Sequence, residues 1–132
     1  MDAHKRIRDE VRGWPQVEEA PHRFGGIEFR LGRRELGHLH GDRLADLPFP
    51  VRIRKELVRD GRAHPHHLLP DSGWVSYWIR SEDDIPGAIS LFRLSYDRAV
   101  AVAEERRRRA GGAAVSAATL DQIDGLDATF RP

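Results

Sequence analysis

Hydrophobic residues follow two different spacings along the first half of the chain. Over residues 2–14 they recur every three or four positions, which predicts a helix with one buried face. In residues 27–31 apolar and charged side chains alternate strictly, which is typical of a half-buried strand. Short turns that contain glycine then separate two more predicted strands, at 35–40 and 44–49. Loops this short favour an antiparallel meander.

The second half of the chain shows the same two patterns. Pro50 suits the first turn of a helix that would end near Gly61. Strands are predicted at 64–69 and 74–79, joined by the turn sequence Pro-Asp-Ser-Gly. A continuous apolar stripe then predicts a long helix from about Asp84 to the four arginines that precede residue 110.

This order of elements predicts an α+β fold. With the order α-β-β-β-α-β-β-α, we expect two layers: a single antiparallel sheet with helices on one face. Residues 1–110 should form this single domain, and residues 111–132 a loosely ordered C-terminal tail. The side of the sheet that faces the helices should carry Ile27, Phe29, Leu31, Val75, Tyr77 and Ile79, packed on Ile89, Phe92 and Tyr96.

Composition narrows the range of functions. The chain has 132 residues, 39% hydrophobic and 33% charged, and its net charge of +1 gives no support to nucleic-acid binding. There is no cysteine, which excludes disulfides, thiol catalysis and metal sites with cysteine ligands. Neither a stretch of roughly 20 apolar residues nor a signal peptide is visible. We therefore expect a soluble cytoplasmic protein without a membrane partner.

Histidines provide the clearest candidate chemistry. His38 and His40 are two residues apart on a predicted strand, so their side chains share a face. His64 and His66 share a face in the same way, and His67 follows them. If the two strands converge, imidazoles from both could bind Zn²⁺ or Fe²⁺. The candidate metal ligands are His38, His40 and His66, and the alternative is that these histidines are structural.

The segment from Gly37 to Asp42 has two interpretations. Its glycines could leave space above the sheet for a ligand, with a histidine oriented by Asp42 or Asp46 as a general base. Alternatively, Gly37 marks a bulge and Gly41 only makes the turn. Downstream, Trp74 and Trp78 share one face of a strand, where they could bind a ligand or the same surface of a second copy.

These patterns favour a ligand-binding or protein-interaction module, with a small molecule or a second copy of the chain as partner. The alternative is an enzyme that uses the histidines, through a metal or as acids and bases, on a small molecule. No nucleophile elbow, phosphate loop or cofactor motif is recognisable, so the cofactor stays unassigned. The candidate ligand-binding residues are His38, His40, Asp42, His66, His67, Trp74 and Trp78.

Two family resemblances support this fold. The segments RFGGIEFRLGRRELGHLHGDRLADLPFPVRIRKEL and HHLLPDSGWVSYWIRSEDDIPGAISLFRLSYDR resemble small bacterial proteins of the luciferase family, over roughly residues 13–100. The order of elements, and the aromatic strand and helix at its end, also resemble YjbR-like and secretion-chaperone folds. The luciferase resemblance implies a shared domain and assigns no reaction, and the chain has no recognisable flavin or nucleotide motif.

Overall fold

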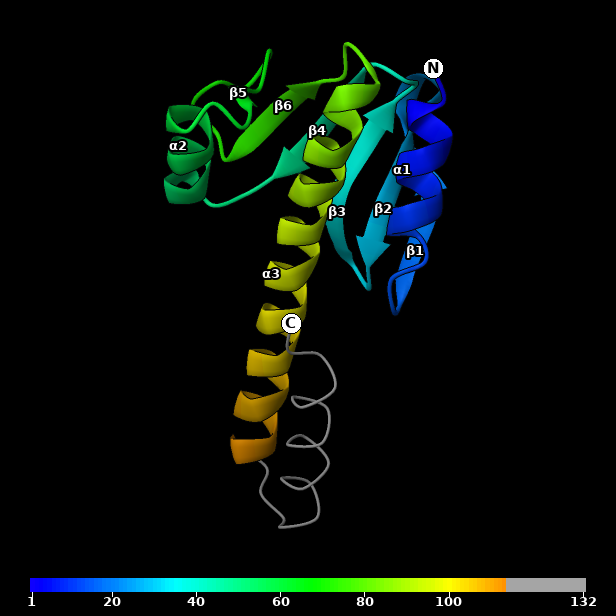
Figure 1. Ribbon diagram of the computed structural model, residues 1–132. Coiled ribbons are helices and arrows are strands. Elements are labelled where there is room, and N and C mark those ends of the chain that lie inside the picture. The colour runs from blue at the N-terminus through cyan, green and yellow to red at the C-terminus, as the bar shows by residue number, and fades with distance from the viewer. Residues whose placement is uncertain (114–132) are drawn as a thin grey trace. The chain divides into compact units, whose positions relative to one another are not determined.

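A computed structural model describes residues 1–113 (Figure 1). Six strands form one sheet in the order β1-β2-β3-β4-β6-β5, and all neighbouring strands are antiparallel. The predicted α+β class is therefore confirmed. The elements are α1 (Ala3–Val11), β1 (Val17–Pro21), η1 (Arg23–Gly25), β2 (Ile27–Leu31), β3 (Arg34–His40), β4 (Leu44–Pro48), α2 (Val51–Arg59), β5 (His64–Pro65), β6 (Trp74–Trp78), η2 (Glu82–Asp84) and α3 (Ile85–Ala113).

Two strands differ from the prediction. Strand β1 was not predicted, because its sequence Val-Glu-Glu-Ala-Pro has no apolar alternation. It lies at the edge of the sheet, paired only with β2, where a proline is tolerated. Strand β5 is shorter than the predicted 64–69, because the backbone N–H groups of Leu68 and Leu69 both donate to Nδ1 of His66. These bonds turn the chain out of the sheet after Pro65.

The chain divides into two units, of which the first comprises residues 1–95, and helix α3 continues from this unit into the second. Within the first unit, α1 and the first turns of α3 lie on the same side of the sheet (Figure 1). The helix continues through Gly111 and Gly112, beyond the predicted domain boundary at residue 110. The boundary itself stays a prediction, and most of the predicted tail, from residue 114 onward, falls outside the described residues.

Phe29 and Phe92 form the centre of the core in the first unit. Both are fully buried, and their rings meet edge to face with centroids 5.4 Å apart. Val75 and Ile79 are buried as predicted, whereas Ile27 and Leu31 are only half-buried. These two lie toward the ends of β2, beside the edge strand. Packing of Tyr96 on the sheet stays a prediction.

Gly37 makes room for the core rather than for a ligand. Its φ is +147°, and a Cβ atom there would lie 2.8 Å from Cε1 of Phe92 and 2.9 Å from the carbonyl oxygen of Asp46. The missing side chain therefore faces helix α3, and the interpretation that this glycine opens a ligand space is wrong. Gly41, with φ +59°, makes the turn between β3 and β4.

We expect Gly37→Ala to lower the free energy of unfolding by about 2–3 kcal/mol, from a strained φ and overpacking against Phe92. Gly32→Ala is the matched control, because Gly32 also has a positive φ of +62° but has open space around its Cα. It should cost only about 1 kcal/mol. Urea unfolding of both variants measures the difference, and equal losses would show that the close contacts at Gly37 relax without cost.

In residues 1–113, no helix combines the length and apolar character needed to cross a membrane.

Candidate functional site

A row of polar residues crosses the sheet on the face opposite helix α3. Glu28, His38, Asp46 and Ser76 are direct cross-strand partners on β2, β3, β4 and β6. Cross-strand partners share a face of a sheet, and successive residues alternate. Because Gly37 faces the helix, His38 and its row face the other way. Asp46 is 1% exposed and Ser76 fully buried, so this row is a buried polar site and not a solvated surface.

Asp46 is the centre of this site. Its Oδ1 accepts a hydrogen bond of 2.7 Å from the Ser76 hydroxyl. Its Oδ2 lies 3.4 Å from Nε2 of His38, 3.2 Å from Nε2 of His40 and 3.6 Å from Nε2 of His66. Three imidazoles therefore meet at one carboxylate oxygen. The structure thus brings together the three histidines that the sequence analysis named as candidate metal ligands.

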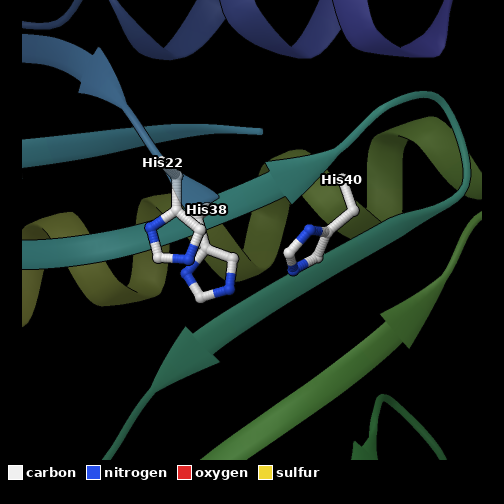
Figure 2. Close-up of side chains that lie close together, drawn as sticks. All are labelled: His22, His38 and His40. Carbon is white, nitrogen blue, oxygen red and sulfur yellow. The ribbon is translucent and has the colours of Figure 1, made fainter. Parts of the chain in front are cut away.

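His22 is a fourth histidine at this site, and the sequence analysis missed it. Its ring stacks on that of His38 with centroids 3.8 Å apart, and His40 lies beside them (Figure 2). His22, His38 and His40 each offer one nitrogen, and these three atoms lie within 4.8 Å of one another. His22 directly follows β1, so only recognition of that irregular edge strand could have placed it here.

For His22, His38 and His66, the hydrogen bonds at Nδ1 decide which ring nitrogen carries a proton. Nδ1 of His22 lies 3.0 Å from Glu28, and Nδ1 of His38 lies 2.7 Å from Glu35. Carboxylates accept hydrogen bonds, so each Nδ1 carries a proton, and in His38 it is Nε2 that faces Asp46. His66 has the opposite arrangement. Its Nδ1 accepts two backbone N–H groups, so the neutral ring carries its proton on Nε2, toward Asp46.

His67 is exposed and lies beside Ser76 and His66. Its Nδ1 is 3.3 Å from the hydroxyl oxygen of Ser76, and its ring stacks on that of His66. Because the Ser76 hydroxyl donates its proton to Asp46, Nδ1 of His67 acts as the donor to Ser76. Asp46, His66 and His67 also form a group whose ligand atoms lie close together. The hydrogen bond of His67 to Ser76 and the position of His66 beside Asp46 suit these two histidines to orienting the Asp46 carboxylate.

Burial and neighbouring charges separate the pKa values of these histidines. Burial lowers the pKa of His38, but its hydrogen bonds with Asp46 and Glu35 outweigh this effect and raise the pKa to about 9. Burial lowers the pKa of His40 and His66, and the positive charge of His38 adds to this effect. Burial also acts to raise the pKa of Asp46, but hydrogen bonds from His38 and Ser76 lower it overall.

The remaining residues that the sequence analysis named as candidates, all in the described part of the chain, form no hydrogen bond or ion pair with Asp46. Two lie near the histidines, and two lie elsewhere. The ring of Trp74 lies 5.4 Å from that of His38, and the ring of Trp78 lies 6.4 Å from that of His67. Asp42 instead accepts a hydrogen bond from the backbone N–H of His4, at the start of α1. His64 is exposed on β5. The predicted homodimer through the tryptophan face stays a prediction.

The fold and site define a small α+β domain with a buried His/Asp cluster on one face of an antiparallel sheet. Residues 33–95 match the family model described as Luciferase domain, which confirms the luciferase-family resemblance over that segment. The match covers 63 of the 132 residues and includes His38, His40, Asp46, His66 and His67, whereas His22 and Glu28 precede it. The YjbR-like resemblance is not confirmed. No curated protein and no solved structure matches the chain significantly.

Proposed function

We propose that His22, His38, His40 and Asp46 bind one divalent transition-metal ion, so that this domain is a metal-dependent ligand-binding module. The observation that carries this proposal is the pair of carboxylates, Glu28 and Glu35, that hold Nδ1 of His22 and His38. Metal-binding histidines commonly donate their second ring N–H to a carboxylate, which fixes the ring and leaves the other nitrogen for the ion.

The spacing of the ligand atoms supports the same proposal. In a tetrahedral site with metal–ligand bonds of about 2.0–2.1 Å, two ligand atoms are about 3.3 Å apart. Oδ2 of Asp46 lies 3.2 Å from Nε2 of His40 and 3.4 Å from Nε2 of His38. Each of these two distances therefore matches the spacing of neighbouring ligand atoms around one ion.

The remaining polar groups fit a supporting role. The Ser76 hydroxyl holds Oδ1 of Asp46, which directs Oδ2 toward the imidazoles. His66 presents a protonated Nε2 to Asp46, so it orients the carboxylate and is not itself a ligand. His22 therefore takes the place of His66 in the predicted ligand set. A site with only nitrogen and oxygen donors, three of them imidazoles, suits Zn²⁺, Fe²⁺ or a similar ion.

Zinc titration of the untagged, metal-free protein tests the proposal. We expect one Zn²⁺ per chain by calorimetry, and His22→Gln and His38→Gln should each weaken the affinity by about 100-fold or more, since each removes a ligand. His66→Gln should weaken it by about 10-fold, the lower end of the range for residues that orient a ligand. Co²⁺ should show the strong visible absorption of a tetrahedral complex.

His64→Gln is the matched control, because His64 is an exposed histidine on the neighbouring strand β5. Its zinc affinity should equal that of the unaltered chain. The proposed ligand set would be contradicted if His22→Gln and His38→Gln left zinc binding intact. It would also be contradicted if His64→Gln weakened zinc binding as much as they do. A similar loss in His66→Gln and His22→Gln would show that His66 is a direct ligand.

A second candidate function rests on His40 and Asp46 alone. His40 is the more exposed of the two histidines of β3, and Asp46 orients its ring through Nε2. A lowered pKa keeps the imidazole neutral near pH 7, as a general base requires. This metal-free alternative is favoured if the zinc titration shows no binding.

A further inference from the structure

Helix α3 carries an open hollow in its C-terminal half, which we call the α3 hollow. Six residues that share one face of the helix line it: Arg98, Ala101, Val102, Glu105, Arg106 and Arg109. Ala101 is exposed and Val102 is half-buried, so apolar surface remains accessible there. The three arginines and one glutamate give the α3 hollow a net charge of +2. Glu105 accepts a hydrogen bond of 3.0 Å from Arg109, so its negative charge is already paired within the helix.

The sequence that follows the described residues has the complementary pattern. Leu120, Ile123 and Leu126 recur every three positions, and an aspartate directly follows each of them, at 121, 124 and 127. On a helix this spacing predicts an apolar row with an acidic row beside it. Thr119 directly precedes the first leucine, where a helix N-cap is expected. The three aspartates and Arg131 give residues 114–132 a net charge of −2.

We propose that residues 119–127 dock as a short amphipathic helix on the α3 hollow of the same chain. Their apolar row contacts Ala101 and Val102, and their aspartates lie beside the arginines. A helix of this length is marginal in water on its own, so it needs a surface that buries its apolar row. The opposite net charges of the segment and the α3 hollow favour this surface. The proposal is independent of the metal site, and it gives an ordered role to a tail that the sequence predicts to be loosely ordered.

The length of the connection allows this contact within one chain. Arg109 lies four residues before the end of α3 at Ala113, or about 6 Å along the helix axis. The five residues 114–118 can span about 17 Å when extended, which is sufficient for the chain to reverse and reach the α3 hollow. The same hollow of a second copy is the less suitable occupant, because a two-fold contact would place one positively charged surface against another.

Paramagnetic relaxation in the full chain tests the proposal. The chain has no cysteine, so a nitroxide attached through Thr129→Cys labels a single position beside the segment. We expect the ¹⁵N amide signals of Ala101 and Val102 to be lost while the nitroxide is oxidised and to return when it is reduced. Signals that remain with the oxidised label would overturn the proposal.

Charge reversal tests the pairing of arginines and aspartates. In the labelled chain, Arg106→Glu combined with Arg109→Glu should restore the two signals, because the α3 hollow then repels the aspartates. Reversal of the three aspartates to arginine in that variant should remove the signals again. Arg52→Glu combined with Lys55→Glu is the matched control, because it reverses two exposed positive charges on α2, outside the α3 hollow. In this control the signals should stay lost.

Two further outcomes would overturn the proposal. If the signals stayed lost in Arg106→Glu with Arg109→Glu, the segment would lie near α3 without using the α3 hollow. A mixture of unlabelled ¹⁵N chains with nitroxide-labelled ¹⁴N chains shows whether the contact forms between chains. Loss of the Ala101 and Val102 signals in that mixture would assign the α3 hollow to the segment of a second copy.

Discussion

Replacing Phe92 with alanine should lower the free energy of unfolding by about 3–5 kcal/mol. Phe92 is fully buried, meets Phe29 edge to face, and fills the space that Gly37 leaves on the sheet. The truncated side chain would leave a cavity that the strand backbone cannot close, because β3 is held between β2 and β4. Urea unfolding followed by circular dichroism measures the loss.

Phe24→Ala is the matched control for this prediction. It removes the same atoms from a ring that is 97% exposed, so the free energy of unfolding should change by less than about 0.5 kcal/mol. If Phe92→Ala were as mild as Phe24→Ala, α3 would contact the sheet differently from the arrangement described here. Similar large losses in both variants would instead indicate that Phe24 is buried in solution.

The fold could be predicted where the burial of one face imposes a regular period on the sequence. Residues 27–31 alternate because β2 packs one face on the core, and the long apolar stripe of α3 follows the helical period for the same reason. Strand β1 lacked this signal, because an edge strand can be formed by backbone pairing without an alternating apolar face. The prediction made strand β5 too long, because the side chain of His66 accepts hydrogen bonds from the backbone of the next residues, and no propensity scale includes such bonds.

The site could be predicted only in part, for a related reason. The spacing of two between His38 and His40 was sufficient to place both on one face of β3. Asp46 holds the centre because the register of β3 against β4 places it directly opposite His38, whereas Asp42, nearer in sequence, binds the backbone of α1. Placing His22 at the site required knowledge that β1 pairs with β2. Cross-strand register therefore accounts for most of what the sequence could not predict.

The metal-free protein should become less stable as the pH rises from 7 to 9.5, because of His38. Its pKa is about 9 in the folded state and near 6.5 in an unfolded chain. A base whose pKa is raised by folding stabilises the protein fully below the unfolded value, and this contribution is lost as the pH passes the folded value. The whole shift contributes about 3 kcal/mol, of which about 2.5 kcal/mol should be lost between pH 7 and 9.5. Urea unfolding at several pH values, with EDTA present, measures it.

The other groups with shifted pKa values should keep their protonation states between pH 7 and 9.5, so we assign the loss of stability in this range to His38. His40 and His66 have lowered pKa values, so they are neutral above pH 7 in both the folded and unfolded states. Asp46 has a lowered pKa and stays ionised throughout, and the pKa of Tyr77, raised by burial, lies above the window.

In His38→Gln the decline between pH 7 and 9.5 should therefore disappear, whereas His64→Gln should retain it. A decline of equal size in His38→Gln would mean that another group loses its proton there. A stability that rose with pH would mean that desolvation of His38 outweighs its bonds to Asp46 and Glu35, so that the ring is neutral in the folded protein.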